Sequence, residues 1–261
     1  MKKAILRWIL ILIVFVLIGI NYNSMNGFLV KNFGSQDKVI IERVIDGDTV
    51  AVNETHIRFL GINTPEKGEF MSKEAKNFTE NNTLGKIVRI ENHGKDKYGR
   101  DLDYLFLDSG ENLNLELVKN GYANYYFPEG KDKYSKQFFS AWDECINSEK
   151  NLCEKSSDKC ANCVALKEFD FKSQTIIFEN RCNFNCNLSG WDIKDEGRKH
   201  FGFNNYILPS GKEVIVKVGN GSNSENLFYW KGYSYIWTNS GDTLFLRDNE
   251  NKLVLWERKN Y

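Results

Sequence analysis

Short apolar runs separated by turn residues dominate the chain between residues 37 and 110. Each run is bounded by Gly, Asp or Asn, and the five runs are residues 39–41, 49–52, 57–62, 87–90 and 105–107. Runs of this length with such boundaries predict β-strands. Five short strands in succession suit a small closed or nearly closed barrel.

Three stretches between and after these runs carry apolar residues at helical spacing. A recurrence every three to four residues predicts amphipathic helices, and a glycine after such a stretch ends the helix. The predicted helices are residues 69–82, residues 113–118 followed by Gly121, and residues 134–146. The first half therefore predicts a barrel with inserted helices and a helix at its end.

The chain beyond residue 170 has a different pattern, with short β-type runs and no helical spacing. The six runs are residues 175–178, 190–193, 214–218, 235–237, 244–246 and 253–256. Many short strands with turn signals between them predict a β-sandwich.

The N-terminus begins with basic residues and continues as an uninterrupted apolar run over residues 8–20. This run is shorter than the ~20 residues that a membrane span needs. Residues 4–6 extend it if Arg7 snorkels to the interface. Because no small-x-small cleavage site follows, we favour an uncleaved anchor over a cleaved signal peptide. The remainder would then face outward, either on a single-pass protein of the cell membrane or as a secreted protein.

The roughly 240 residues that follow exceed one average domain, so the chain predicts two domains in a β-rich fold. The predicted divisions are a signal anchor or signal peptide (1–21), a tether (22–36), a first domain (37–153), a cysteine-containing joint (154–169) and a second domain (170–261).

The charge of the chain is balanced, with 35 Lys and Arg residues against 35 Asp and Glu residues. A protein that binds nucleic acid tightly and without specificity presents a broad basic face, which this composition does not indicate. The balance favours a hydrolase that contacts a few phosphates over an architectural nucleic-acid binder.

Oxygen donors gather around the second and third predicted strands. Asp48 follows an Asp-Gly turn, and Asn63 and Thr64 follow the next strand. Carboxylate, amide and main-chain carbonyl oxygens are the ligands that Ca²⁺ takes. Asp46 and Gly47, taken alone, are interpreted as turn formers.

Two arginines and an acid lie close to these donors in the sequence. Arg58 and Glu66 lie near the two ends of one segment, and Arg100 follows a glycine turn. An unpaired charge inside an apolar strand is costly, so Arg58 is either salt-bridged or turned to a functional pocket, and we favour the pocket. Arginines and a metal beside an acid indicate phosphodiester hydrolysis, because they stabilise the charge on phosphoryl oxygens.

Three motifs carry a resemblance to a known family. They are IDGDT at residues 45–49, IRFLGINTPE at residues 57–66 and DKYGR at residues 96–100. From about Lys38 to about Cys153 the chain resembles the staphylococcal nuclease (thermonuclease) family. The resemblance implies an OB-fold barrel and a calcium-dependent nuclease. It makes Arg58 and Arg100 phosphate clamps and Glu66 the candidate general base.

The resemblance also implies that Asp48, Asn63 and the Thr64 carbonyl hold calcium. Where the family usually has an aspartate, this chain has Asn63, so the site has one carboxylate fewer.

Four further residues are weak candidates for substrate contact. Lys97 and Tyr98 belong to the third motif, and aromatic residues such as Tyr125 and Tyr126 can stack on the bases of single strands. Tyr98 and Arg100 could instead be ordinary surface residues, and core packing is an equal alternative for Tyr125 and Tyr126.

Six cysteines lie between residues 145 and 186. The last four read C-x2-C, a gap of eighteen, and C-x3-C, which is close to a zinc-ribbon spacing. An even number of cysteines in an outward-facing chain favours disulfides instead. We favour disulfides, and zinc remains the alternative.

Two stretches of the second domain carry another resemblance. Residues 188–196 (LSGWDIKDE) and 238–248 (TNSGDTLFLRD) resemble the lamin-tail domain, an immunoglobulin-like fold, over roughly Phe171 to Tyr261. His200 lacks a neighbouring nucleophile and is interpreted as a surface or packing residue. The domain is interpreted as an interaction module for a protein, envelope or nucleic-acid partner.

Two functions follow from these patterns. The first is a calcium-dependent nuclease that hydrolyses DNA and RNA outside the cytoplasm. The alternative is a catalytically weakened nucleic-acid or protein-binding module on the same barrel. Arg58, Glu66 and Arg100 favour the enzyme, whereas Asn63 favours the weakened module.

Overall fold

The computed structural model describes residues 36–128 and 130–259. The predicted anchor (1–21) and almost all of the predicted tether (22–36) lie outside the described residues. Within the described ranges, no helix is long and apolar enough to cross a lipid bilayer.

The first domain is built on one six-stranded sheet with the strand order β1-β6-β7-β4-β3-β2. Consecutive strands β1 and β2 lie at opposite edges, although only two residues separate them, so the sheet curls into the nearly closed barrel of an OB fold. The strands are β1 (Gln36–Ile40), β2 (Arg43–Asp46), β3 (Thr49–Val52), β4 (Thr55–Phe59), β6 (Ile87–Lys95) and β7 (Asp101–Phe106). A separate short ladder pairs β5 (Ile62–Asn63) with β8 (Asn124–Tyr125).

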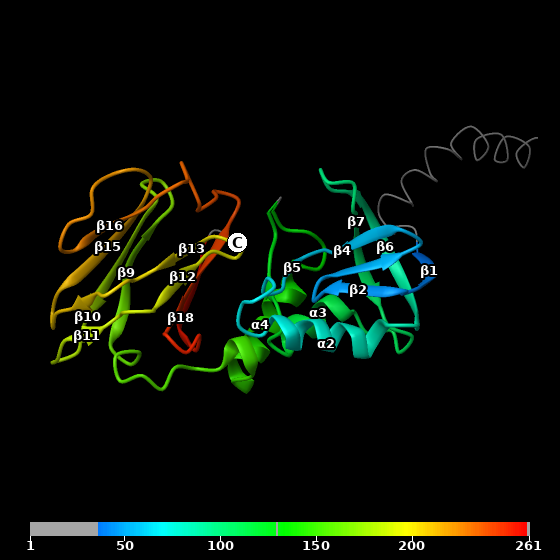
Figure 1. The fold of residues 1–261 in the computed structure, drawn as a ribbon, viewed down its shortest axis with the longest axis horizontal. Coiled ribbons are helices and arrows are strands. Elements are labelled where there is room, and N and C mark those ends of the chain that lie inside the picture. Colours follow the sequence, from blue (N-terminus) through cyan, green and yellow to red (C-terminus); the bar gives the residue numbers. More distant parts are fainter. Residues whose placement is uncertain (1–35, 129, 260–261) are drawn as a thin grey trace, which may run out of the picture.

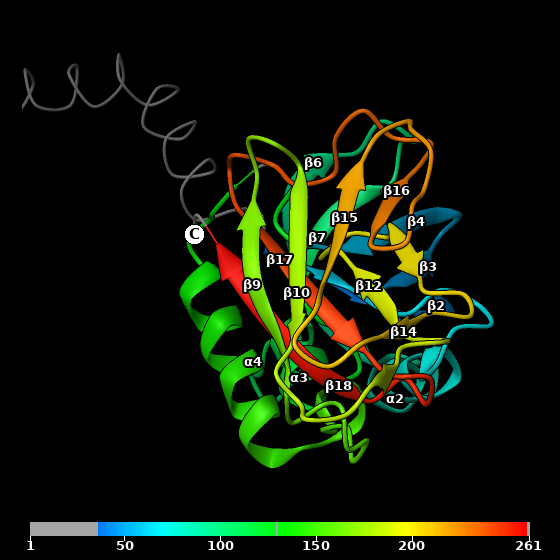
Figure 2. The same cartoon turned by 90° about the vertical axis from the view of Figure 1, so that its left-hand side faces the viewer.

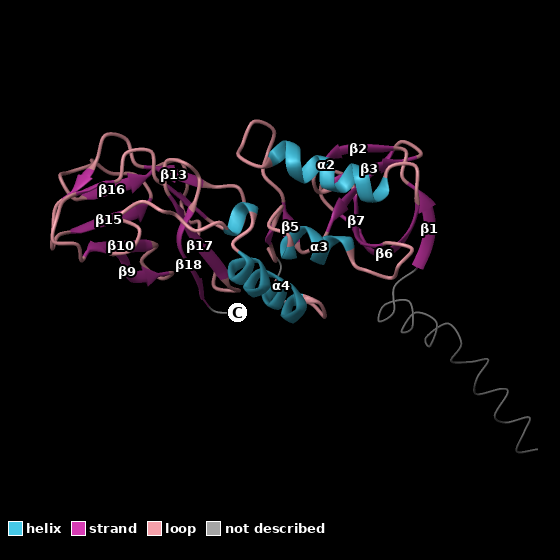
Figure 3. Cartoon of the chain, turned by 90° about the horizontal axis from the view of Figure 1, so that it is seen from below, coloured by secondary structure: helices cyan, strands magenta, loops and turns pink. Residues whose placement is uncertain are grey.

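Three helices pack on the barrel, and all three were predicted (Figure 3). They are α2 (Ser72–Thr83), α3 (Leu113–Lys119) and α4 (Ser135–Ser148). The buried face of α4 includes Phe138, Ala141, Trp142 and Cys145, which is the spacing of one apolar stripe. α2 begins three residues later than predicted, because the chain first makes a turn that ends at Met71 with a φ of 68°.

The second domain is an immunoglobulin-like β-sandwich of two four-stranded sheets, β16-β15-β10-β9 and β13-β12-β17-β18 (Figures 1 and 2). A small ladder pairs β11 (Cys186–Asn187) with β14 (Ile207–Leu208). The strands of the first sheet are β9 (Val164–Asp170), β10 (Thr175–Asn180), β15 (Glu213–Val218) and β16 (Leu227–Trp230). Those of the second are β12 (Asp192–Lys194), β13 (His200–Gly202), β17 (Asp242–Arg247) and β18 (Leu253–Lys259).

One predicted strand of this domain is wrong. Residues 235–237 form no strand, and the backbone N–H groups of Ile236 and Trp237 donate to the Gln174 side chain at 2.8 and 3.1 Å. The side-chain oxygen of Gln174 thus accepts the hydrogen bonds that main-chain carbonyls of a neighbouring strand would otherwise accept. The strand β9 also begins at Val164, inside the segment predicted as a joint.

The two domains share an apolar contact. Phe245 and Leu253 of the sandwich belong to the same buried cluster as the barrel residues. The rings of Trp142 and Phe245 lie 5.2 Å apart, and Tyr125 Oη is 2.7 Å from Thr243 Oγ1. Side chains from both domains therefore form one continuous core at the boundary.

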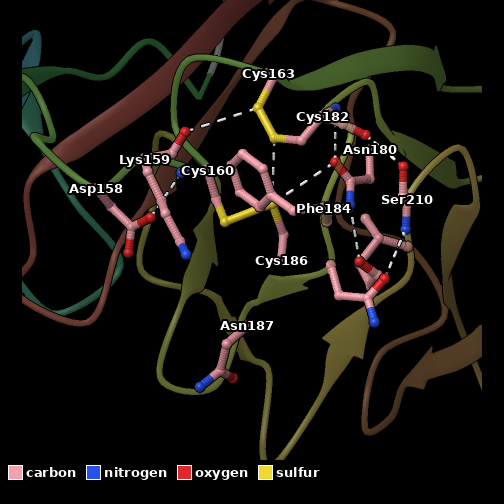
Figure 4. The surroundings of a disulfide bond; sticks show 12 residues. Asp158, Lys159, Cys160, Cys163, Asn180, Cys182, Phe184, Cys186, Asn187 and Ser210 are labelled. Atoms are coloured by element: carbon pink, nitrogen blue, oxygen red, sulfur yellow. Dashed lines mark hydrogen bonds between the residues drawn. A yellow bond between two sulfur atoms is a disulfide. The ribbon is translucent and has the colours of Figure 1, made fainter.

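The six cysteines are oxidised, as predicted. The buried side chain of Asn180 organises the loop between β10 and β11 by donating to two main-chain carbonyls and accepting from the N–H of Cys182 (Figure 4). The three disulfides are Cys145–Cys153, Cys160–Cys186 and Cys163–Cys182. The first joins α4 to the short helix η1 (Asn151–Cys153). The other two tie the segment before β9 to the start of β11 and to the loop between β10 and β11.

Candidate functional site

The Asp46-Gly47-Asp48 turn between β2 and β3 packs tightly against its surroundings. A Cβ on Gly47 would come within 2.8 Å of both Ala75 and Thr64, so only glycine permits this approach. Asp48 is buried, and its Oδ2 accepts the Thr64 backbone N–H at 2.8 Å. The turn therefore brings Asp48 directly to the segment that follows β5.

Arg58 on β4 is ion-paired and also borders a cleft, so both sequence alternatives hold. Its Nη1 lies 2.6 Å from Asp48 Oδ2. Its Nη2 donates to the Ile62 carbonyl at 2.9 Å and to Asn63 Oδ1. A buried guanidinium needs such partners, because an unpaired charge in the interior is unfavourable. Asp48, Arg58 and Asn63 thus form one buried polar network.

A cleft of about 640 Å³ joins the two predicted arginine clamps. Arg100 is held there by Asp96, whose Oδ2 accepts its Nε–H at 2.7 Å and also lies 2.7 Å from its Nη2. Burial alone would raise the pKa of Asp96, but the hydrogen bonds from Arg100 lower it below the usual range. Described residues that line the cleft include Arg58, Lys97, Tyr98, Arg100 and Tyr126.

The tyrosine candidates separate clearly in the structure. Tyr98 is 74% exposed at the cleft, and Tyr126 lines it partly buried. Tyr125 is 0% exposed and lies in the core at the domain boundary. It therefore has no surface on which a base could stack, and the packing alternative describes its environment.

Glu66 lies outside the set of described residues that line the cleft. Its backbone N–H donates to Glu69 Oε2 at 2.9 Å. Its carboxylate pairs with Arg198 of the second domain, with Oε1 2.6 Å from Nε, and its side chain is 44% exposed. The proposed base is thus accessible and is held by a residue from the other domain.

Asp46 is a functional candidate that the sequence interpretation took for a turn former. Its Oδ1 accepts the Asp48 backbone N–H at 3.2 Å. Burial, followed by the neighbouring Asp48 carboxylate, raises the pKa of Asp46 to about 6. Two carboxylates that repel each other form a place where a cation is stabilised.

The donor set fits a hard divalent cation. Asp48 Oδ2 and Asn63 Oδ1 already converge on one positive group, the Arg58 guanidinium. Asp46 and Thr64 add oxygen atoms next to them, and oxygen-only sites suit Ca²⁺. Among described residues, the one group of three or more His, Cys, Asp or Glu side chains with metal-ligand spacing is Cys163, Cys182 and Cys186, which are disulfide-bonded.

The sequence interpretation did not predict that three residues of the second domain contact this region, and it took one of them, His200, for a surface or packing residue. Glu196, Arg198 and His200 reach Asn63, Glu66 and Glu69 respectively. They lie next to or within the lamin-tail resemblance, which indicated a fold and not a site. No local signal in the sequence links them to the first domain.

Known sequences match both halves of the chain. A profile described as "Staphylococcal nuclease homologue" matches residues 56–165, and one described as "Lamin Tail Domain" matches residues 159–258. The thermonuclease of Staphylococcus intermedius is 30% identical over 169 residues, which cover 59% of this chain and 100% of that protein.

Two further relatives cover different shares of their own length. Endonuclease YhcR of Bacillus subtilis (strain 168) is 35% identical over 127 residues, which are 39% of this chain and 10% of that protein. Uncharacterized protein MJ1439 of Methanocaldococcus jannaschii is 31% identical over 167 residues, which are 51% of this chain and 75% of that protein.

Proposed function

Because the chain belongs to the staphylococcal nuclease family, we propose that it is a calcium-dependent nuclease that hydrolyses phosphodiester bonds of DNA and RNA. The observation that carries this proposal is the cleft of about 640 Å³ with Arg58 and Arg100 among its lining residues. Two guanidinium groups in one cleft are suited to bind the oxygens of one phosphodiester.

The two arginines stabilise the negative charge that grows on the phosphoryl oxygens during hydrolysis. Asp48 and Asn63 hold Arg58 in place before substrate arrives, and Asp96 does the same for Arg100. Groups that are already oriented need no reorganisation when the charge develops, which is why such sites accelerate reactions. Tyr98 and Tyr126 in the same cleft supply faces against which a base can stack.

Glu66 is the proposed general base that takes a proton from the attacking water. A carboxylate suits this role if it is accessible and held in a defined direction. Glu66 meets both conditions, since its side chain is 44% exposed and is paired with Arg198.

Asp46, Asp48, Asn63 and the Thr64 carbonyl are the residues that would hold calcium. When bound, the ion would neutralise charge on a phosphoryl oxygen and orient the phosphodiester. Asn63 supplies an oxygen without a charge, so we expect weak binding, in the ~10⁻⁴–10⁻³ M range of extracellular calcium modules.

We further propose that the protein acts outside the cytoplasm. The apolar segment at residues 8–20 supports export or anchoring. Three disulfides support an oxidising compartment. The lamin-tail domain would then present a surface to a protein, envelope or nucleic-acid partner. Treatment of intact cells with an external protease tests the location, and protection of both domains would contradict it.

A zymogram tests the proposed activity. The full-length protein is run in gels that contain DNA or RNA, and the gels are developed with calcium or with a chelator. We expect clearing with calcium and none with the chelator. Clearing in both conditions would remove calcium from the proposal, and no clearing in either would favour the weakened binding module.

A further inference from the structure

One turn of the second domain lies against the candidate site of the first. This docking turn, residues 195–199, connects β12 to β13. In Figure 1 the β12–β13 end of the sandwich faces β5 of the barrel domain. The docking turn brings Glu196 to Asn63, which is 133 positions earlier in the chain.

The main-chain carbonyl of Glu196 accepts hydrogen bonds from two side-chain amides of the first domain. Asn63 Nδ2 lies 3.0 Å from it and Asn124 Nδ2 lies 2.8 Å from it. Asn63 and Asn124 are paired residues on β5 and β8. A single carbonyl therefore ties the docking turn to both strands of this small ladder.

The two contacts of Asn63 determine which way its amide points. Its Oδ1 accepts from Arg58, and its Nδ2 donates to Glu196. A flipped amide would place its NH₂ against the guanidinium and its oxygen against the carbonyl, where neither can bond. A carboxylate at position 63 would have no proton to donate to Glu196. The docking turn thus gives a physical reason for an amide where the family usually has an aspartate.

Basic residues of the second domain also hold the segment that contains Glu66. Arg198 pairs with Glu66, and His200 Nε2 lies 3.2 Å from Glu69 Oε1. Lys194 lies 3.8 Å from the same residue, Glu69. The side chains of Arg198 and Glu66 are 48% and 44% exposed, so their pair contributes little stability. In this structure the Glu66 carboxylate points toward Arg198.

The docking turn is a fixed part of the structure. Glu196 is buried, and its carboxylate accepts from the Phe127 backbone N–H and from Thr243 Oγ1, each at 3.3 Å. Burial with hydrogen bonds on both the carbonyl and the carboxylate is typical of a rigid contact. The cleft beside Arg58 and Arg100 remains open with the turn in place. These facts favour a supporting role over a lid.

We propose that the nuclease site is shared between the two domains, with Glu196 and Arg198 as positioning residues for Asn63 and Glu66. This inference rests on the proposed function and gives the lamin-tail domain a role in it. Glu196 keeps the Asn63 oxygen on Arg58. Arg198 keeps the Glu66 carboxylate in one direction for proton transfer.

The test compares Arg198→Ala with Arg198→Lys and with a matched control in the full-length protein. Arg181→Ala is the control, because Arg181 pairs its Nε with Glu179 at 2.9 Å within the second domain and is similarly exposed. With calcium and DNA, we expect Arg198→Ala to lower kcat on the order of 10- to 100-fold at nearly unchanged KM, as misplacement of a reacting group does. Arg198→Lys should recover part of the loss, and Arg181→Ala should match the parent.

Three outcomes in an active parent would overturn the inference while leaving the proposed function intact. They are equal kcat values for Arg198→Ala and Arg181→Ala, a higher kcat for Arg198→Ala, or a rise in KM alone. The first makes the pair incidental, the second makes the turn an obstruction, and the third makes Arg198 a substrate contact. An inactive parent would overturn the proposed function itself.

A second measurement reports on the contact without activity. In ¹H–¹⁵N spectra of the calcium-free protein, Arg198→Ala should shift the backbone amide signals of residues 66–69, and Arg181→Ala should not. Unchanged signals for these residues in Arg198→Ala would show that the docking turn does not hold Glu66.

Discussion

The candidate site contains a buried group and an exposed group of residues that differ in how they are held. Asp48, Arg58 and Asn63 are 1%, 6% and 2% exposed, and Arg58 is bonded to the other two. The side chains of Glu66 and Arg100 are 44% and 28% exposed, and each is held by one charged partner.

Because of this difference, we expect substitutions in the two groups to affect the stability of the protein differently. Removing one member of a buried ion pair leaves a charge without a partner in the interior, which is strongly destabilising. Removing an exposed partner costs little, because water replaces it. Under the proposed function, the buried group would therefore serve both folding and substrate binding, whereas the exposed group could lose its chemical role while the fold persists.

The largest effect is expected from the exposed group, with Glu66→Gln. If Glu66 is the general base, the rate should fall by the ~10²–10⁴ that such catalysis contributes, with calcium affinity little changed. Glu74→Gln on the exposed side of α2 is the control and should keep parent activity. A loss of calcium binding in Glu66→Gln, measured by titration, would instead make Glu66 a metal ligand.

Single substitutions of the two arginine clamps test the difference between the buried and the exposed group directly. Arg58→Ala and Arg100→Ala should each lower the rate on the order of 10²–10³-fold, as loss of one charge-stabilising donor does. Only Arg58→Ala should also lower the free energy of unfolding, by about 3–5 kcal/mol, because Asp48 is left buried and unpaired. Denaturant unfolding measures the difference.

Arg43→Ala is the control for these two variants, since Arg43 is exposed on β2, an edge strand of the same sheet. It should affect neither rate nor stability. Equal stability of Arg58→Ala and Arg100→Ala would mean that the buried network does not form. Full activity in both variants would show that the two arginines do not bind the phosphodiester.

A smaller effect is expected from Asn63→Asp, which adds a charge to the buried group. A further carboxylate should lower the calcium midpoint of activity by about tenfold, because calcium sites are tuned by the number of charged ligands. Asn82→Asp on α2 loses a comparable amide bond, to the Phe78 carbonyl at 2.8 Å, and should leave the midpoint unchanged. The same midpoint in Asn63→Asp and the parent would place residue 63 outside the metal shell.

The smallest effect is a pH dependence of stability at Asp46. Burial and Asp48 raise the pKa of Asp46 from 3.8 to about 6, so the folded protein takes up this proton more readily than the unfolded chain. The stabilisation that comes from this difference in proton binding is fully present below pH 3.8, the ordinary pKa, and is lost as the pH rises through about 6. With a chelator present, the parent should therefore lose stability relative to Asp46→Asn across this window.

Thermal unfolding from pH 3 to pH 8 checks this prediction, and the difference between the two proteins is the quantity of interest. Calcium should restore stability at the upper end, because it favours the ionised carboxylate. A difference that does not vary with pH would mean that Asp46 titrates normally.

Local patterns in the sequence were sufficient to predict most of the helices and strands. Residues 49–52 were predicted as a strand and form β3, and the apolar spacing around Trp142 correctly predicted α4. Periodicity works in such cases because each residue's side of the element depends only on its neighbours along the chain. It failed at residues 235–237, where the partner is the side chain of Gln174.

The sequence by itself determined the two folds, the family of the first domain and some of the residues of the cleft, among them Arg58 and Arg100. Motif spacing places Arg58 and Arg100 at fixed points of a barrel, so their convergence follows from the fold. Tertiary structure alone decided that Tyr125 is buried at the domain boundary and that burial raises the pKa of Asp46. Hydrogen bonds and ion pairs act over a few ångströms, and only the packing of the domains brings Glu196 within 3.0 Å of Asn63, 133 positions away.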